Sequence, residues 1–229
     1  MNNLIKSNGN IKLGHSMGTI SKLMGNDIYE VNGIKVAGTC GKHCEVCKKE
    51  CYVKKSYRYP SVVLGHARTT IAFREDLAKA FDSMDVQLSR KRKPFAQVRI
   101  NQSGEIETTA ELLGYVELAT KHPETDFYLY TKNFEAVRET IATATLPNNL
   151  TILISVWHEY GLAEFKEFED LPNIKAFVYM DGFQYDLEIG TTCKAYGKDG
   201  KLDHNITCDK CRKCFDRRNN HKVIGCNEH

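Results

Sequence analysis

Eight of the nine cysteines fall into two short groups whose spacing is typical of metal or iron–sulfur ligation. The N-terminal group is Cys40, Cys44, Cys47 and Cys51, and the C-terminal group is Cys193, Cys208, Cys211 and Cys214. The first residues contain no apolar run of signal-peptide length, and no segment reaches the roughly 20 apolar residues that span a bilayer. We therefore expect a cytoplasmic protein without a membrane partner. In a reducing compartment, nine cysteines, an odd total of which eight are clustered, favour metal ligation over disulfides.

The C-terminal group has the spacing C-x14-C-x2-C-x2-C. Four thiolates with two C-x2-C steps can close a tetrahedral zinc site, and they can equally hold an iron–sulfur cluster. Three ligands in the run C-x2-C-x2-C favour a cluster, with zinc as the alternative. We interpret Cys226 as a thiol outside the site.

The elements that would position these cysteines alternate between helix and strand from residue 61 to 181. Periodicity predicts strands over residues 95–100, 126–132, 150–157 and 174–180, and a short strand immediately before Cys40. It predicts helices over residues 69–85, 108–123, 133–147 and 161–172. Alternation of this kind predicts crossover units and a parallel sheet. The expected fold class is α/β, a short or partial (β/α) barrel over residues 1–185, followed by a cysteine-rich metal-binding extension over residues 186–229.

Each predicted strand carries polar or aromatic residues on one face, which a sheet buried on both faces would lack. We interpret this face as the lumen of the barrel, where a substrate of unknown identity would bind. The lumen residues with chemistry to offer, predicted as catalytic, are Arg99, Lys132, Ser155 and Asp181.

Cys40, Cys44 and Cys47, in the spacing C-x3-C-x2-C ahead of strand–helix units, resemble the cysteine loop of the radical S-adenosylmethionine superfamily. That resemblance implies a 4Fe-4S cluster with one iron open to S-adenosylmethionine, whose reductive cleavage makes a deoxyadenosyl radical and requires an electron donor. A second match is "SGE", Ser103 to Glu105, after the strand over residues 95–100. It stands where those enzymes carry a Gly-Gly-Glu motif that binds the cofactor's amino group, so Ser103, Gly104 and Glu105 are predicted to bind the cofactor.

Cys51 departs from that pattern. "CKKECY", together with "SGE", "FYLYTK" and the distal cysteines, more closely resembles the gene product 88 family of phage and plasmid proteins. This resemblance implies a phage or mobile-element protein in the host cytoplasm and assigns no reaction. Two N-terminal ligand sets stay open: Cys40, Cys44 and Cys47, or Cys47 and Cys51 with one of the earlier pair.

The rival hypothesis is a non-catalytic binding protein stabilised by zinc or by a closed iron–sulfur cluster. The formal charge is only +3, but basic residues gather in "KKECYVKKSYR", "SRKRKP" and "CRKCFDRRNNHK". Such runs can contact phosphates, so nucleic acid is the predicted partner of this alternative.

Overall fold

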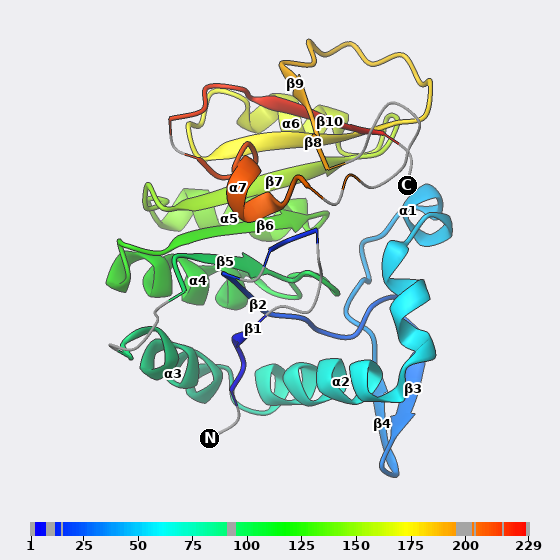
Figure 1. Ribbon diagram of the computed structural model, residues 1–229, viewed down its shortest axis with the longest axis vertical. Coiled ribbons are helices and arrows are strands. Elements are labelled where there is room, and N and C mark those ends of the chain that lie inside the picture. The colour runs from blue at the N-terminus through cyan, green and yellow to red at the C-terminus, as the bar shows by residue number, and fades with distance from the viewer. Residues whose placement is uncertain are drawn as a thin grey trace.

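The computed structural model describes residues 3–7, 12–14, 16–90, 95–195, 203, 205–216 and 218–227. Its centre is an eight-stranded sheet with the order β1-β2-β5-β6-β7-β8-β10-β9 (Figure 1). All neighbouring pairs are parallel except β1 with β2. The strands are β1 (Lys6–Ser7), β2 (Met17–Thr19), β5 (Gln97–Ile100), β6 (Asp126–Thr131), β7 (Leu150–Val156), β8 (Ile174–Met180), β9 (Thr191–Thr192) and β10 (Val223–Asn227).

Strands β5 to β8 are joined by helices and lie side by side in chain order. Right-handed crossovers to successive neighbours place the connecting helices on one face of such a sheet, as Figure 1 shows for the helices between β5 and β8. The large apolar core lies between this face and the helices. The helices are α2 (Pro60–Glu75), α3 (Leu77–Leu88), α4 (Thr109–Lys121), α5 (Phe134–Thr143) and α6 (Leu162–Phe168).

The sheet is open within the described residues, because β1 and β9 at its two edges do not pair with each other. A mixed α/β fold with a mostly parallel sheet is therefore confirmed, but no closed barrel is seen. The division at residue 185 stays a prediction, although β9 and β10 from the expected extension pair in the same sheet as β8.

The four predicted strands agree with β5 to β8 to within two residues at each end. The helix predicted over residues 69–85 is two helices, because Asp76 accepts a hydrogen bond from the backbone N–H of Lys79 and caps α3. The strand expected before Cys40 was placed wrongly in the sheet. It is β4 (Ile34–Ala37), which pairs with β3 (Ile28–Val31) in a separate hairpin.

The face of the sheet opposite the helices carries a smaller apolar cluster. Phe215, from the segment after α7 (Cys208–Cys211), stacks on Tyr128 of β6 with ring centroids 4.5 Å apart. Leu13, Met17, Leu153 and Ile224 complete the buried part of this cluster. The cysteine-rich segment is thereby packed onto the sheet. Among the described helices, none combines the length and the apolar composition needed to cross a membrane.

Candidate metal centres

The N-terminal cysteines lie on a loop at the carboxyl ends of the strands, beside the short helix α1 (Glu45–Lys49) (Figure 1). Cys44 caps this helix, and its Sγ accepts a hydrogen bond from the Cys47 N–H at 3.5 Å. Cys51 precedes a 3₁₀ helix, η1 (Tyr52–Arg58), and its Sγ lies 3.9 Å from Met24 Sδ. Electrostatic contacts join Cys47 to Cys40, Cys44 and Cys51. The four predicted ligands therefore lie close together.

Short backbone hydrogen bonds fix this loop to the segment that follows β2. Cys40 N–H donates to Gly25 O at 2.7 Å, and Thr39 N–H donates to Leu23 O at 3.0 Å. The Thr39 hydroxyl also donates to Leu23 O and accepts the Glu105 N–H, both at 2.8 Å. The cysteine loop and the "SGE" loop are thus joined through one buried hydroxyl group.

Lys132, predicted to be catalytic, lies directly against the N-terminal thiols. Burial alone would lower its pKa, but the adjacent Cys47 and Glu105 outweigh burial and raise it. Burial raises the pKa of Cys40 to about 12, with the Glu105 carboxylate adding to the rise. Burial also raises the pKa of Cys47, and its hydrogen bond with Lys132 opposes this. The structure thus places one lysine ammonium group among the thiols and beside a buried carboxylate.

Glu105, predicted to bind a cofactor, is largely committed to holding the fold. Its Oε1 accepts hydrogen bonds from the Thr131 hydroxyl at 2.7 Å and from Ile106 N–H at 2.8 Å, and Oε2 accepts Lys132 N–H at 2.9 Å. Its side chain is buried, and burial raises its pKa. Three of about four acceptor positions are occupied, so Glu105 has little capacity left for a ligand ammonium group.

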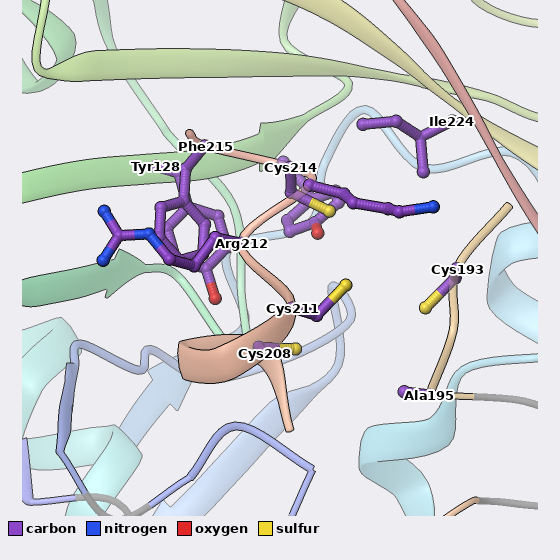
Figure 2. Close-up of a pocket in the computed structure, with 11 residues that line it drawn as sticks. Tyr128, Cys193, Ala195, Cys208, Cys211, Arg212, Cys214, Phe215 and Ile224 are labelled. Atoms are coloured by element: carbon purple, nitrogen blue, oxygen red, sulfur yellow. The ribbon is translucent and has the colours of Figure 1, made fainter. Parts of the chain in front are cut away.

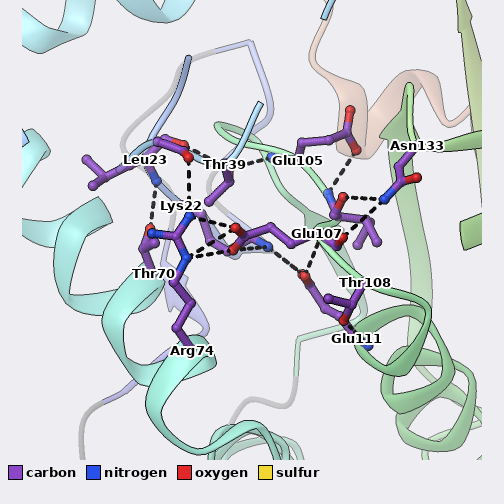
Figure 3. A network of polar contacts seen from close by, with 12 residues as sticks. Lys22, Leu23, Thr39, Thr70, Arg74, Glu105, Glu107, Thr108, Glu111 and Asn133 are labelled. Carbon is purple, nitrogen blue, oxygen red and sulfur yellow. Dashed lines mark hydrogen bonds and ion pairs between the residues drawn. The ribbon is translucent and has the colours of Figure 1, made fainter. Parts of the chain in front are cut away.

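Both loops adjoin a buried network of polar contacts that could not be predicted from residue types and spacing (Figure 3). Lys22 Nζ donates to both carboxylate oxygens of Glu111 at 2.7 Å, and both side chains are buried. The Lys22 backbone N–H donates to Ser103 O at 2.8 Å. Gly104 adopts φ +84, and an added Cβ would lie 2.6 Å from the Thr39 hydroxyl. Gly104 is thus required for close packing.

The C-terminal cysteines line a pocket on the face of the sheet opposite the helices, and Figure 2 shows the sulfur atoms of all four around it. Burial raises the pKa of Cys214 to about 12, and a hydrogen bond from the Tyr130 hydroxyl opposes this. Contact with Cys193 and burial both raise the pKa of Cys226, which is buried. Cys226 lies against Cys193 but is not among the residues that line the pocket, so its interpretation as a thiol outside the site stays a prediction.

One strand brings the two cysteine groups together. Tyr130 of β6 contacts Cys214, and Lys132, two residues further on, contacts Cys47. Two residues advance a strand by roughly 7 Å. Arg99, on the neighbouring strand β5, places its guanidinium group 4.7 Å from the Tyr130 ring centroid. Because alternate residues of a strand point to the same side, Tyr130 and Lys132 contact the C-terminal and the N-terminal cysteines, respectively, from the same side of the sheet.

The remaining predicted residues lie further along that face. Ser155 of β7 is buried. Asp181, after β8, pairs with His158 Nε2 at 2.8 Å. His158 has a left-handed backbone at φ +56, which is uncommon for a residue other than glycine. Sequence reasoning missed its pairing with Asp181, although both residues follow strands at the same edge.

In the described part of the chain, no three His, Cys, Asp or Glu side chains are arranged to hold a single metal ion as they stand. The thiols of each group are neighbours, and their side chains would have to turn toward a common centre to bind one. The basic run over residues 89–94 lies mostly outside the described residues, and so does Arg217 of the third run.

Comparison with known proteins gives one match. The family model for gene product 88 covers residues 3–217. No curated protein and no solved structure matches the chain significantly. None of these comparisons supports the resemblance to radical S-adenosylmethionine enzymes. The family match spans both cysteine groups and nearly the whole sheet, and on this basis the chain belongs to the gene product 88 family.

Proposed function

We propose that this protein binds iron–sulfur clusters at its two cysteine groups. The observation that carries the proposal is that the four C-terminal cysteines line one pocket, while the N-terminal cysteines interact electrostatically with one another. Thiolates without nitrogen or carboxylate ligands are the donor set of iron–sulfur clusters and of structural zinc. A bound cluster would supply one-electron chemistry.

At the N-terminal centre, Cys40, Cys44 and Cys47 are the proposed ligands and Cys51 is the neighbour that could close the set. Lys132 would oppose the negative charge that thiolates bring, because its ammonium group contacts Cys47. At the C-terminal centre Cys193, Cys208, Cys211 and Cys214 are the proposed ligands, with Cys226 against Cys193.

S-adenosylmethionine is the proposed cofactor of a second, enzymatic form of this function, which would require an electron donor. It is favoured by the position of the cysteine loop at the carboxyl ends of parallel strands, where α/β proteins bind ligands. The three hydrogen bonds that Glu105 already accepts argue against its binding the cofactor's ammonium group. Arg99, Ser155 and Asp181 would then face substrate.

A metal-stabilised nucleic-acid binder is the candidate from a different class. Lys48, Lys49, Lys54, Lys55 and Arg58 are exposed along α1 and η1, directly beside the N-terminal cysteines. Such a basic surface would bind phosphates with an affinity that falls steeply as salt is raised. Zinc at both cysteine groups would favour this candidate over the iron–sulfur protein.

Selective loss of each centre tests the proposal. In protein purified without oxygen, Cys44→Ala should abolish the N-terminal signal in electron paramagnetic resonance spectra and leave the C-terminal signal, and Cys211→Ala should do the reverse. Cys226→Ala is the matched control outside both proposed sets. Loss of all metal in Cys44→Ala would contradict two independent centres.

Added S-adenosylmethionine distinguishes the two forms of the function. If one iron of the N-terminal centre lacks a protein ligand, the cofactor should change its spectrum, and Cys51→Ala should leave the cluster intact. If Cys51 is a ligand, the cofactor should change nothing and Cys51→Ala should make the cluster labile. An unchanged spectrum in fully loaded protein would refute the enzymatic form alone.

A further inference from the structure

Arg99 is a partly buried cation whose charge no carboxylate balances in the described part of the chain. Its Nη2 donates to the Tyr52 hydroxyl at 3.3 Å, and its guanidinium group lies over the Tyr130 ring. Its Nε is enclosed and has no hydrogen-bond partner. Both neighbours are neutral phenols, so they leave the positive charge of Arg99 uncompensated.

Two other enclosed cations of this region have anionic neighbours. Lys22 pairs with Glu111 at 2.7 Å. Arg212, between Cys211 and Cys214 in the chain, pairs with Asp126 at 2.6 Å. Lys175 has no carboxylate partner among the described residues, but its Nζ donates to two backbone carbonyl groups. Because removing a charge from water is costly unless it is paired, Arg99 is a cation of the described residues that lacks its counter-charge.

The C-terminal cysteines lie where that counter-charge is needed. Arg99 acts electrostatically on Cys208. Tyr130 lies under the guanidinium group and hydrogen-bonds to Cys214. Four thiolates around a divalent ion, or around a 4Fe-4S core, carry a net negative charge. The pocket that these cysteines line would therefore become anionic when a metal or cluster is bound.

We propose that Arg99 is the counter-charge of the metal centre held by Cys193, Cys208, Cys211 and Cys214. This inference rests on the proposed metal binding and holds for zinc as well as for a cluster, because both are negative with four thiolates. Tyr52, which accepts a hydrogen bond from Arg99, links it to the N-terminal cysteines. Tyr52 directly follows Cys51 in the chain, and its hydroxyl donates to Gln102 O. Arg99 is thus a positioning residue between the two centres.

Metal affinity tests this role through Arg99→Gln, which removes the charge, and Arg99→Lys, which keeps it. Metal affinity is measured by competition with a chelator. All variants are made in the Cys44→Ala background, which leaves only the C-terminal centre to bind metal. Loss of an outer partner of a metal site lowers affinity about 10- to 100-fold. We expect Arg99→Gln to lower the metal affinity by a factor in this range, and Arg99→Lys to keep an affinity close to that of the parent protein.

Unfolding of the metal-free protein separates this role from a purely structural one. Arg99→Gln should change the urea midpoint of the metal-free form little and lower that of the loaded form. The control Arg212→Gln should lower both, because it removes the ion pair between Arg212 and Asp126. In iron-loaded protein Arg99→Gln should also make the reduction potential more negative, because a nearby positive charge favours the reduced cluster.

Two results would overturn the inference while leaving the proposed function intact. One is a parent protein that binds metal and an Arg99→Gln variant that binds it equally tightly. The other is a loss of stability in Arg99→Gln that is as large in the metal-free form as in the loaded form. A parent protein that binds no metal would instead refute the proposed function.

Discussion

The buried pair Lys22–Glu111 gives the sharpest test of how the N-terminal loops are held. Lys22 Nζ lies 2.7 Å from both carboxylate oxygens, and the two side chains are 0% and 3% exposed. The next anion, Glu107, is 3.9 Å away. Removing one partner of such a pair leaves a charge buried without its counter-ion, which costs about 3–5 kcal/mol. A domain has only about 5–15 kcal/mol of stability.

We therefore expect Glu111→Gln to lower the free energy of unfolding of the metal-free protein by about 3–5 kcal/mol, measured by urea denaturation. The double variant Lys22→Met with Glu111→Leu should cost less than the two single changes together, because no buried charge remains. The matched control is Glu167→Gln, whose partner Arg138 lies at 2.6 Å with both side chains 43–49% exposed. Water screens that exposed pair, so its loss should change the free energy of unfolding far less than the loss of the buried pair.

The pair also bears on the cysteine loop, because the backbone of residues 22 and 23 bonds to both Ser103 and Thr39. Glu111→Gln should thus weaken metal retention at the N-terminal cysteines more than at the C-terminal ones. If Glu111→Gln and Glu167→Gln cost the same, Lys22 does not depend on Glu111 and the reasoning fails.

Three further predictions concern the same region. Thr39→Val leaves the buried Glu105 N–H without its acceptor and removes one of the two hydrogen bonds to Leu23 O. It should cost about 1–3 kcal/mol in urea unfolding, and a cost no larger than that of an exposed threonine would contradict it. Gly104→Ala places a methyl group 2.6 Å from the Thr39 hydroxyl at φ +84, so its thermal midpoint should fall by several degrees; an unchanged midpoint would show that the loop yields. Burial, with Lys6 nearby, lowers the pKa of His66 to about 4. In the unfolded chain His66 takes up a proton near pH 6.5, whereas in the folded protein it does so only near pH 4. The free energy of unfolding should therefore fall by at most about 3 kcal/mol as the pH is lowered from about 6.5 to about 4. His66→Gln should flatten this part of a pH series of urea unfolding, and an unchanged slope would remove His66 as its cause.

Long helices and strands could be predicted from the sequence because their apolar side chains recur at the spacing that places them on one buried face. Strand β8 has the predicted bounds, residues 174–180. Strand β2 has three residues, too few for a period to show, so the sequence predicts only the hairpin strand β4 ahead of β5. The break between α2 and α3 depends on a cap at Asp76 inside an otherwise helical pattern.

The candidate site could be predicted where residue type and spacing carry the information. The cysteines of both groups are recognisable in this way, and their binding of metal stays a prediction. Lys22 and Glu111 are not recognisable, since a lysine and a glutamate 89 residues apart look like surface residues until the fold pairs them. Glu105 was singled out, but two of its three hydrogen-bond donors come from Thr131 and Lys132, which only folding brings to it.

Iron and acid-labile sulfide content, measured on protein purified without oxygen, tests the central claim most directly. The account predicts iron and sulfide in equal amounts, as in 4Fe-4S clusters. Both amounts should fall by roughly half in Cys44→Ala, because one of two clusters is lost. Zinc without sulfide, or protein free of metal, would contradict it.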